Sequence, residues 1–510
     1  MKHNIFIKIA LATLTISAMT ACQDIKDTFS DWAGDGEIRY IGMCDNLTVS
    51  PGWKRLMVNW TNNVDPVIEK VKVKWASDNM ADSVLLDRGT EEYNITNLDN
   101  ETYSITVSSL DKDGRSSMEN TIYSRPYTSE HEEVMSFTRV IAKHFFLGNN
   151  LVLEFSGWQD GLESAILKYT KKDDTAGEIA LNKDIVSKTL YSLPDQIDPS
   201  KPVVLYRTGR IGSCSDLITF DPYELQHVKS YTSDFKEFIK TKYGLGSTQI
   251  SEDGNINDAW ANNVETLEID NNLNSLEDIL NMPKLKKLII GKNTYLTERG
   301  ANDEERGQYK LYDPTTSNTA IELMHKISGL QVERYNKHYQ GLLKASYVTD
   351  KGAATLPSLN YYDLSKATAS VYPEDMEGYN SHPNYLFDGN LSSCWKPLAT
   401  SSQQTYIITM DLGKEVEASG VCIVQKNFSE TDQDEDIAPS KIGLQYADKS
   451  GGFKDATYVT DNYIGTSTGQ TIVLPFAGGK KTVRYLKISI PSQAYFGNFD
   501  ATLAEVRLYK

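Results

Sequence analysis

Residues 385–395 read YLFDGNLSSCW, and together with four later segments they decide the fold of the C-terminal part of the chain. The later segments are TMDLG at 409–413, KIGLQYAD at 441–448, VRYLKI at 483–488 and AEVRLY at 504–509. An Asp-Gly pair favours a turn, and the apolar residues of the last three segments are typical of strands. The strand-like segments predict a β domain at the end of the chain.

This set resembles the discoidin domain, also called the coagulation factor 5/8 type C domain, whose bacterial members are mostly family 32 carbohydrate-binding modules. The resemblance covers residues 366–510. It implies a jelly-roll β-sandwich of the galactose-binding-like type, with ligand loops at one end.

The resemblance also implies a structural Ca²⁺ ion that ties a loop to the last strand. Six or more oxygens, two of them anionic, suit this hard cation. In the alternative, the Asp-Gly pair forms only a turn and the last acidic residue faces water. The ligands carried over are the Tyr385, Asn390 and Ala504 carbonyls, the Asp388 and Glu505 carboxylates, and Ser393.

A glycan site is expected in the loop before the last strand, QAYFGNF at 493–499. Sugar recognition needs an exposed aromatic face and a few directional hydrogen bonds, and this loop supplies three aromatic residues. Tyr495 and Phe496 are the expected stacking residues, whereas Phe499 is equally well placed in the core. Asn498 is a candidate donor.

Two further candidate donors, Lys396 and Lys426, depart from the pattern of galactose-binding relatives. In those relatives a His follows the motif Trp and an Arg ends a central strand. Here Lys396 follows Trp395, which we expect in the core, and Gln425-Lys426 stands at the strand end. The departures put galactose itself in doubt. In the alternative, the candidate donors are ordinary surface residues.

The N-terminus has the pattern of a lipoprotein signal peptide over residues 1–21. Lys2 and Lys8 flank an apolar run, 9–19, that is too short to span a bilayer. The run ends in MTAC, which resembles a bacterial lipobox, so Cys22 is the expected lipidation site; the alternative is a coincidental Cys. Residues 22–39 are acidic and predict a solvated tether. No later apolar run would cross a membrane, so the lipid would be the only membrane attachment.

Residues 40–128 predict a fibronectin type III-like sandwich. Short alternating strands such as LMVNW at 56–60 and VKVKW at 71–75 are broken by Asn, Asp, Gly and Pro. The segments 93–98, 103–107 and 111–114 resemble the E, F and G region of that family. A weaker copy is expected over 129–223, with strands at 151–155, 165–169 and 203–207. Core positions are predicted for Trp60, Trp75 and Trp158.

Residues 224–365 change character. Apolar residues at helical spacing predict a helix over 225–243. The segments 264–269, 285–293 and 321–332 then look like leucine-rich repeats, each with a strand, a polar turn and a helical return. Such units bury their apolar faces only by stacking, so they predict a small α/β region. It either spaces the other domains or binds a protein partner.

The composition excludes several classes of function. A formal net charge of −17 argues against nucleic acid as a partner. Of five Cys, four remain after Cys22 (Cys44, Cys214, Cys394 and Cys422), too few for a disulfide framework; a Cys394–Cys422 bridge is weighed against two thiols. No metal, nucleophile-elbow or P-loop motif is present, and no segment is left for the two-carboxylate scaffold of a glycosidase.

The sequence therefore predicts a mainly β, multi-domain protein without enzymatic activity. The arrangement resembles surface lipoproteins of Bacteroidota polysaccharide-utilisation systems. It implies a protein anchored in the outer membrane by lipid, facing the cell surface, that binds carbohydrate and contacts an outer-membrane glycan transporter complex. The alternative function is an adhesin or scaffold that binds a protein partner through the repeat region.

Overall fold

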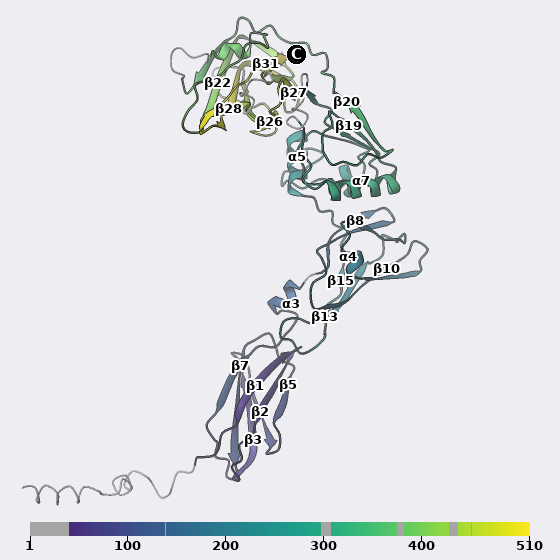
Figure 1. Cartoon of the computed structure of the whole chain (residues 1–510), viewed down its shortest axis with the longest axis vertical. Helices are drawn as coiled ribbons and strands as arrows, with labels where there is room; N and C mark the ends of the chain where they lie inside the picture. The colour runs from purple at the N-terminus through teal and green to yellow at the C-terminus, as the bar shows by residue number, and fades with distance from the viewer. Residues whose placement is uncertain (1–39, 138, 297–307, 375–381, 428–436, 450) are drawn as a thin grey trace, which may run out of the picture. The chain divides into compact units, whose positions relative to one another are not determined.

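The computed structural model describes residues 40–137, 139–296, 308–374, 382–427, 437–449 and 451–510. The predicted signal peptide, the predicted tether and Cys22 lie outside these residues, as do two charged stretches, NDEER at 302–306 and ETDQDED at 430–436, for which the sequence predicts solvated loops. The chain forms two compact units, Met1–Phe137 with Thr208–Asp221, and Thr138–Arg207 with Pro222–Lys510 (Figure 1). Within the described residues, no helix is both long and apolar enough to cross a membrane.

The first unit contains an antiparallel sandwich of a three-stranded and a four-stranded sheet, in the orders β1-β2-β5 and β4-β3-β6-β7. Trp60 on β2 and Trp75 on β3 are 4% and 7% exposed, so their predicted core positions are confirmed. The strands are β1 (Asp45–Gly52), β2 (Arg55–Thr61), β3 (Ile68–Ala76), β4 (Ala81–Asp87), β5 (Glu92–Thr96), β6 (Tyr103–Asp111) and β7 (Asn120–Ser124).

Strands also follow at the three positions expected for the second sandwich. They form the sheets β12-β9-β8 and β11-β10-β13-β14, with β15 beside β13. The prediction for Trp158 is wrong, because this residue lies in a loop after β9 and is only partly buried. The elements are α3 (Glu132–Ser136), β8 (Ile141–Leu147), β9 (Asn150–Phe155), β10 (Leu162–Thr170), β11 (Ala176–Leu181), α4 (Lys183–Val186), β12 (Tyr191–Ser192), β13 (Val204–Gly209), β14 (Ile218–Thr219) and β15 (Tyr223–Glu224).

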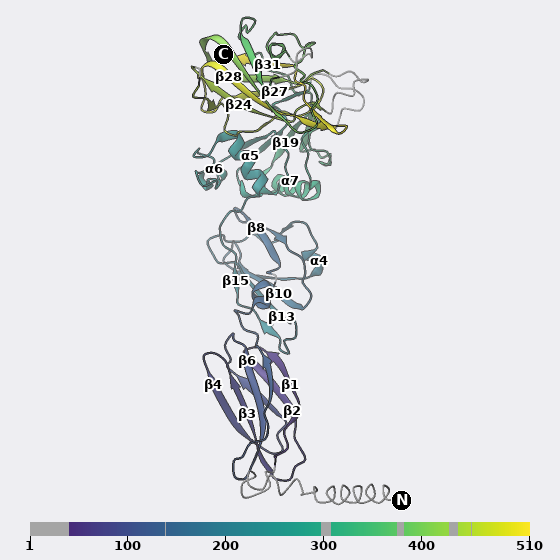
Figure 2. The ribbon, with the colours of Figure 1, turned by 90° about the vertical axis from the view of Figure 1, so that its left-hand side faces the viewer.

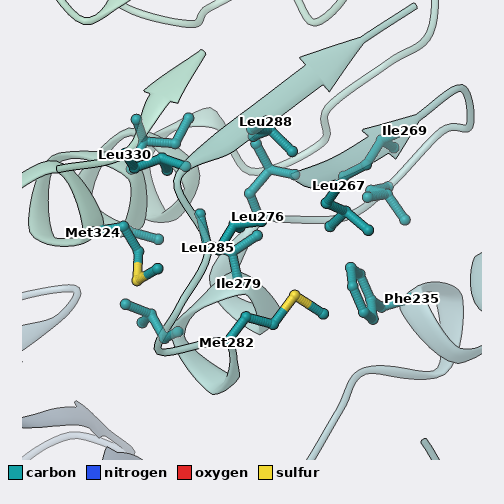
Figure 3. Close-up of a cluster of buried hydrophobic side chains, with 14 of the residues drawn as sticks. Phe235, Leu267, Ile269, Leu276, Ile279, Met282, Leu285, Leu288, Met324 and Leu330 are labelled. Atoms are coloured by element: carbon teal, nitrogen blue, oxygen red, sulfur yellow. The ribbon is translucent and has the colours of Figure 1, made fainter. Parts of the chain in front are cut away.

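A parallel sheet in the order β16-β17-β19-β20 follows. Leucine, isoleucine and methionine side chains from the strands and returning helices point toward one another beneath it (Figure 3). The helix expected over 225–243 begins only at Ser233, because Tyr223 and Glu224 pair with β13. The elements are α5 (Ser233–Tyr243), α6 (Asp258–Ala261), β16 (Thr266–Ile269), η1 (Glu277–Asn281), β17 (Lys287–Ile290), α7 (Pro314–Ser328), β19 (Gln331–Tyr335) and β20 (Val348–Gly352).

The C-terminal domain packs two sheets face to face, in the orders β21-β22-β28-β24-β25 and β18-β27-β23-β31, with β26 beside β24 (Figure 2). Strand β18 directly follows β17 of the parallel sheet in the chain, and its Leu296 pairs with Gln470 of β27. The elements are β18 (Thr294–Leu296), β21 (Thr368–Tyr372), η2 (Pro383–Leu386), β22 (Thr405–Ala418), β23 (Gly420–Val424), β24 (Lys441–Ala447), β25 (Lys454–Asp455), β26 (Asn462–Tyr463), β27 (Gln470–Pro475), β28 (Lys481–Pro491), β29 (Gln493–Tyr495), β30 (Asn498–Asp500) and β31 (Glu505–Tyr509).

The core of this domain includes the motif tryptophan. Trp395 is fully buried and meets Tyr406 edge to face, with ring centroids 5.3 Å apart. No disulfide joins Cys394 to Cys422; Cys422 is buried as expected, whereas Cys394 is only partly buried.

Candidate functional site

The loop after η2 and the start of β31 meet at the predicted Ca²⁺ site. The Gly389 N–H donates to Glu505 Oε1 at 3.2 Å, which joins the two halves of the motif. The Asn390 N–H donates to Asp388 Oδ1 at 2.8 Å, and the Ser393 hydroxyl donates to Asp388 Oδ2 at 2.6 Å. The same hydroxyl oxygen lies 2.7 Å from the Asn390 carbonyl oxygen. These hydrogen bonds hold the oxygens of Asp388, Asn390 and Ser393 close together within the loop.

Glu505 is the unusual group of this loop. Its side chain is 2% exposed, and its second oxygen, Oε2, is buried and makes no hydrogen bond within the described residues. Burial, and to a lesser degree the negative charge of Asp388, raises the pKa of Glu505 to about 7. A buried carboxylate with an unsatisfied oxygen is costly unless a proton or a cation accompanies it.

The residues present fit a hard divalent cation. Asp388, Asn390, Ser393 and Glu505 lie together, and their oxygens are the ligands that Ca²⁺ prefers. Of the two remaining predicted ligands, Ala504 is fully buried beside Glu505, and Tyr385 belongs to η2, which packs against β31. In the described part of the chain no group of three or more His, Cys, Asp or Glu could hold a metal. The candidate Ca²⁺ site is not such a group, because it has only two carboxylates and takes its other ligands from carbonyl and hydroxyl oxygens.

The aromatic residues of the expected glycan site lie on the hairpin formed by β29 and β30. Tyr495 pairs with Asn498 across the turn, and Phe496 takes a left-handed φ of 44° at its tip. Phe496 is 83% exposed, whereas Tyr495 is partly buried. Their rings meet edge to face, with centroids 4.7 Å apart. Because Phe496 points into solvent at a strained backbone position, the hairpin presents an apolar face rather than filling the core.

The hairpin is fixed to the sandwich through its second strand. The Thr400 and Phe499 backbones exchange hydrogen bonds of 2.9 and 2.7 Å, and Phe499 is partly buried. Asn498 is exposed next to the tip. The hairpin is therefore held at its base, and its tip is open.

The predicted basic donors have different surroundings. Lys396 Nζ lies 4.0 Å from Asp500 Oδ2, so this ammonium group is partly neutralised by an acid that the sequence did not single out. Lys426 is partly buried, and its carbonyl oxygen accepts the Gly469 N–H at 3.0 Å.

Gln425 is a structural residue. It is 1% exposed, and its side-chain amide donates to the Pro439 and Gly465 carbonyls, both at 2.7 Å. It therefore links the end of β23 to two neighbouring loops. A substitution here would change the support of the loops rather than a ligand contact.

Comparison with known proteins gives one family match. A family described as a domain of unknown function, DUF4998, matches residues 22–201. This range covers the first sandwich and most of the second, and it ends before the parallel sheet and the C-terminal domain. No curated protein shows a significant similarity to the chain.

Solved structures that match parts of the chain include carbohydrate-binding modules and fibronectin type III domains. CpGH89CBM32-5 from Clostridium perfringens, in complex with GalNAc-β-1,3-galactose, is 16% identical over 30% of this chain and 100% of its own, with a TM-score of 0.24. The family 32 module of Clostridium perfringens NanJ, in complex with galactose, is 18% identical over 30% and 98%, with a TM-score of 0.24. A two-domain fibronectin type III segment of chicken tenascin is 14% identical over 36% and 100%, with a TM-score of 0.18.

Proposed function

We propose that this protein is a non-catalytic, lipid-anchored glycan-binding protein of the outer membrane, and that the loop end of its C-terminal domain holds the sugar. The observation that carries the proposal is the β29–β30 hairpin. Phe496, 83% exposed, and Tyr495 form an aromatic corner at the tip. A pyranose ring offers an apolar C–H face to such a corner, and Asn498 stands beside it to hydrogen-bond a hydroxyl group.

A structural Ca²⁺ ion belongs to the same proposal. Asp388, Asn390, Ser393 and Glu505 would hold it, with the Tyr385 and Ala504 carbonyls completing the shell. The ion would supply positive charge next to the buried Glu505 carboxylate and would stiffen the loop. Its part is structural, because no step of binding needs it to touch the sugar.

The parallel sheet gives little support to the alternative function, a protein-binding scaffold. Glu333 on its solvent face is paired with Lys287 at 3.0 Å and with Lys351 at 3.4 Å. A cluster of one acid and two bases is a charged surface rather than the apolar patch that marks many protein-binding sites. We therefore assign recognition to the C-terminal domain.

The test is a glycan array followed by titration with the chain from residue 23 onward. One stacked sugar contributes only a few kcal/mol net, so Kd should lie between about 10⁻⁶ and 10⁻³ M. The double variant Tyr495→Ala with Phe496→Ala should lose binding to the glycans that the wild type selects. Tyr123→Ala, which removes a ring that is 71% exposed in the first unit, should leave binding unchanged. Equal binding by the double variant would exclude the hairpin.

A further inference from the structure

A cavity of about 540 Å³ lies in the repeat region, at a place to which the sequence assigned no role. One wall is the start of α5, residues 232–234. The second is the turn 272–274 after β16. The third is Tyr312, just before α7. Its volume lies within the range of small-molecule sites, about 300 to 1,000 Å³.

The walls are held in place by their own hydrogen bonds. The Leu273 N–H donates to the Lys310 carbonyl at 3.1 Å, and the Tyr312 N–H donates back to the Leu273 carbonyl at 3.1 Å. On the other side, the Asn274 N–H donates to Asp234 Oδ2 at 2.5 Å. The turn is thus fastened both to α5 and to the segment that carries Tyr312.

A buried acid fixes the first residue of the α5 wall. Asp278, 1% exposed, accepts the Thr232 N–H at 3.1 Å and the Thr232 hydroxyl at 2.5 Å. The walls are therefore arranged before any ligand arrives. A preformed site avoids part of the entropy cost of binding.

The groups that face the cavity include an aromatic ring and several small polar side chains. Tyr312 is 66% exposed, so a large part of its ring is open to a ligand. Ser233 and Asn274 line the same cavity, and neither side chain makes a hydrogen bond with any described residue. Asp234 uses one carboxylate oxygen on Asn274, and its other oxygen accepts no hydrogen bond from the described residues.

We propose that this cavity is a second carbohydrate subsite that binds a neutral sugar unit. The Tyr312 ring would stack on the apolar face of a pyranose. The Asp234 carboxylate would accept hydrogen bonds from sugar hydroxyls, and the Asn274 amide and the Ser233 hydroxyl would complete the contacts. A carboxylate in the wall disfavours an acidic sugar, because two negative charges would meet at short range.

Other ligand classes fit the cavity less well. A stable protein interface needs about 800 Å² on each partner, whereas only seven residues line this hollow. A divalent cation needs several carboxylate or carbonyl ligands, and Asp234 is the one acid among the lining residues. The combination of one open ring with hydroxyl, amide and carboxylate groups suits a polyhydroxylated ring.

The test uses the chain from residue 23 onward in the Tyr495→Ala, Phe496→Ala background, so that the hairpin site cannot contribute. Cellotetraose, mannotetraose and galactotetraose are titrated by calorimetry. We expect at least one to bind, with Kd of about 10⁻⁴ to 10⁻³ M, and Tyr312→Ala to weaken it about tenfold or more. Tyr312→Phe should retain binding, because the ring rather than the hydroxyl makes the contact. Asn274→Ala should weaken binding, and Tyr123→Ala should not.

The two sites fail independently. Loss of array binding in the Tyr495→Ala, Phe496→Ala variant reports on the hairpin, whereas the Tyr312 series reports on this cavity. The subsite is refuted if none of the three tetrasaccharides binds in the background variant. It is also refuted if Tyr312→Ala and Asn274→Ala both bind as well as their parent, with thermal unfolding showing all forms folded.

Discussion

The buried Glu505 carboxyl should make the folding stability of the protein depend on pH and on Ca²⁺. Its pKa is raised from 4.5 to about 7 by burial. In the calcium-free protein the folded state therefore holds a proton that the unfolded chain releases at lower pH. The contribution of the protonated Glu505 to the free energy of unfolding is fully present below about pH 4.5. It is lost as the pH rises through about 7, and the total loss is about 3 kcal/mol.

Calcium should reverse this loss. A cation at Glu505 and Asp388 replaces the proton, so Ca²⁺ should raise the melting temperature strongly at about pH 8 and little at about pH 5. Glu505→Gln keeps an oxygen that can accept the Gly389 N–H but has no charge. We expect this variant to be more stable than the calcium-free wild type at about pH 8, and insensitive to Ca²⁺.

Differential scanning calorimetry of the chain from residue 23 onward, with EDTA or with Ca²⁺ across this pH range, measures both effects. Glu415→Gln is the matched control, because Glu415 is an exposed glutamate of the same domain, on β22. Asp388→Asn should remove the calcium response while keeping most of the pH dependence. Parallel pH curves for wild type and Glu505→Gln in EDTA, or an equal calcium response in both, would refute the reasoning.

Three further predictions concern other parts of the chain. Cys22→Ala should abolish incorporation of radiolabelled fatty acid, and equal labelling would exclude lipidation. Asp216 accepts hydrogen bonds from Arg55 at 2.7 and 2.8 Å, which lowers the pKa of Asp216. Asp216→Asn should cost about 1–3 kcal/mol in urea unfolding at neutral pH and less below about pH 4, whereas an equal cost at both would contradict this pairing. Trp395→Ala should cost about 3–5 kcal/mol, whereas the exposed Phe496→Ala should cost under about 0.5 kcal/mol; similar costs would contradict their opposite burial.

Local pattern was enough to predict many of the strands. Trp60 and Trp75 alternate with polar neighbours, and period-two alternation places such residues on the inner face of a sheet. Trp158 lies in a loop, so a core position predicted from its aromatic side chain alone was wrong. The helix expected from 225 failed at its start because β15 pairs with a strand many residues earlier, and helical spacing carries no signal of that pairing.

The candidate sites were predictable only in part, because contacts between residues far apart in the sequence leave no local pattern. The Asp-Gly-Asn motif and the final Glu could be found by resemblance, and the structure brings them together. The Lys396–Asp500 pair joins residues about a hundred positions apart, and nothing near either residue announces the other. The cavity beside Tyr312 is built from three separate segments. Its single sequence signal is the Asn-rich turn at 271–274, which reads equally well as a loop.

Strand β18 means that the C-terminal domain is not a self-contained cassette. Tyr295 of β18 pairs with Thr471 of β27, so a strand encoded before residue 300 closes the edge of a sheet encoded after residue 400. A fragment that starts at residue 366 would expose the hydrogen-bonding groups of β27, and an open edge of this kind recruits other chains. A recombinant protein that received residues 366–510 without β18 would therefore be less soluble. The region of the parallel sheet and the C-terminal domain are expected to be inherited together.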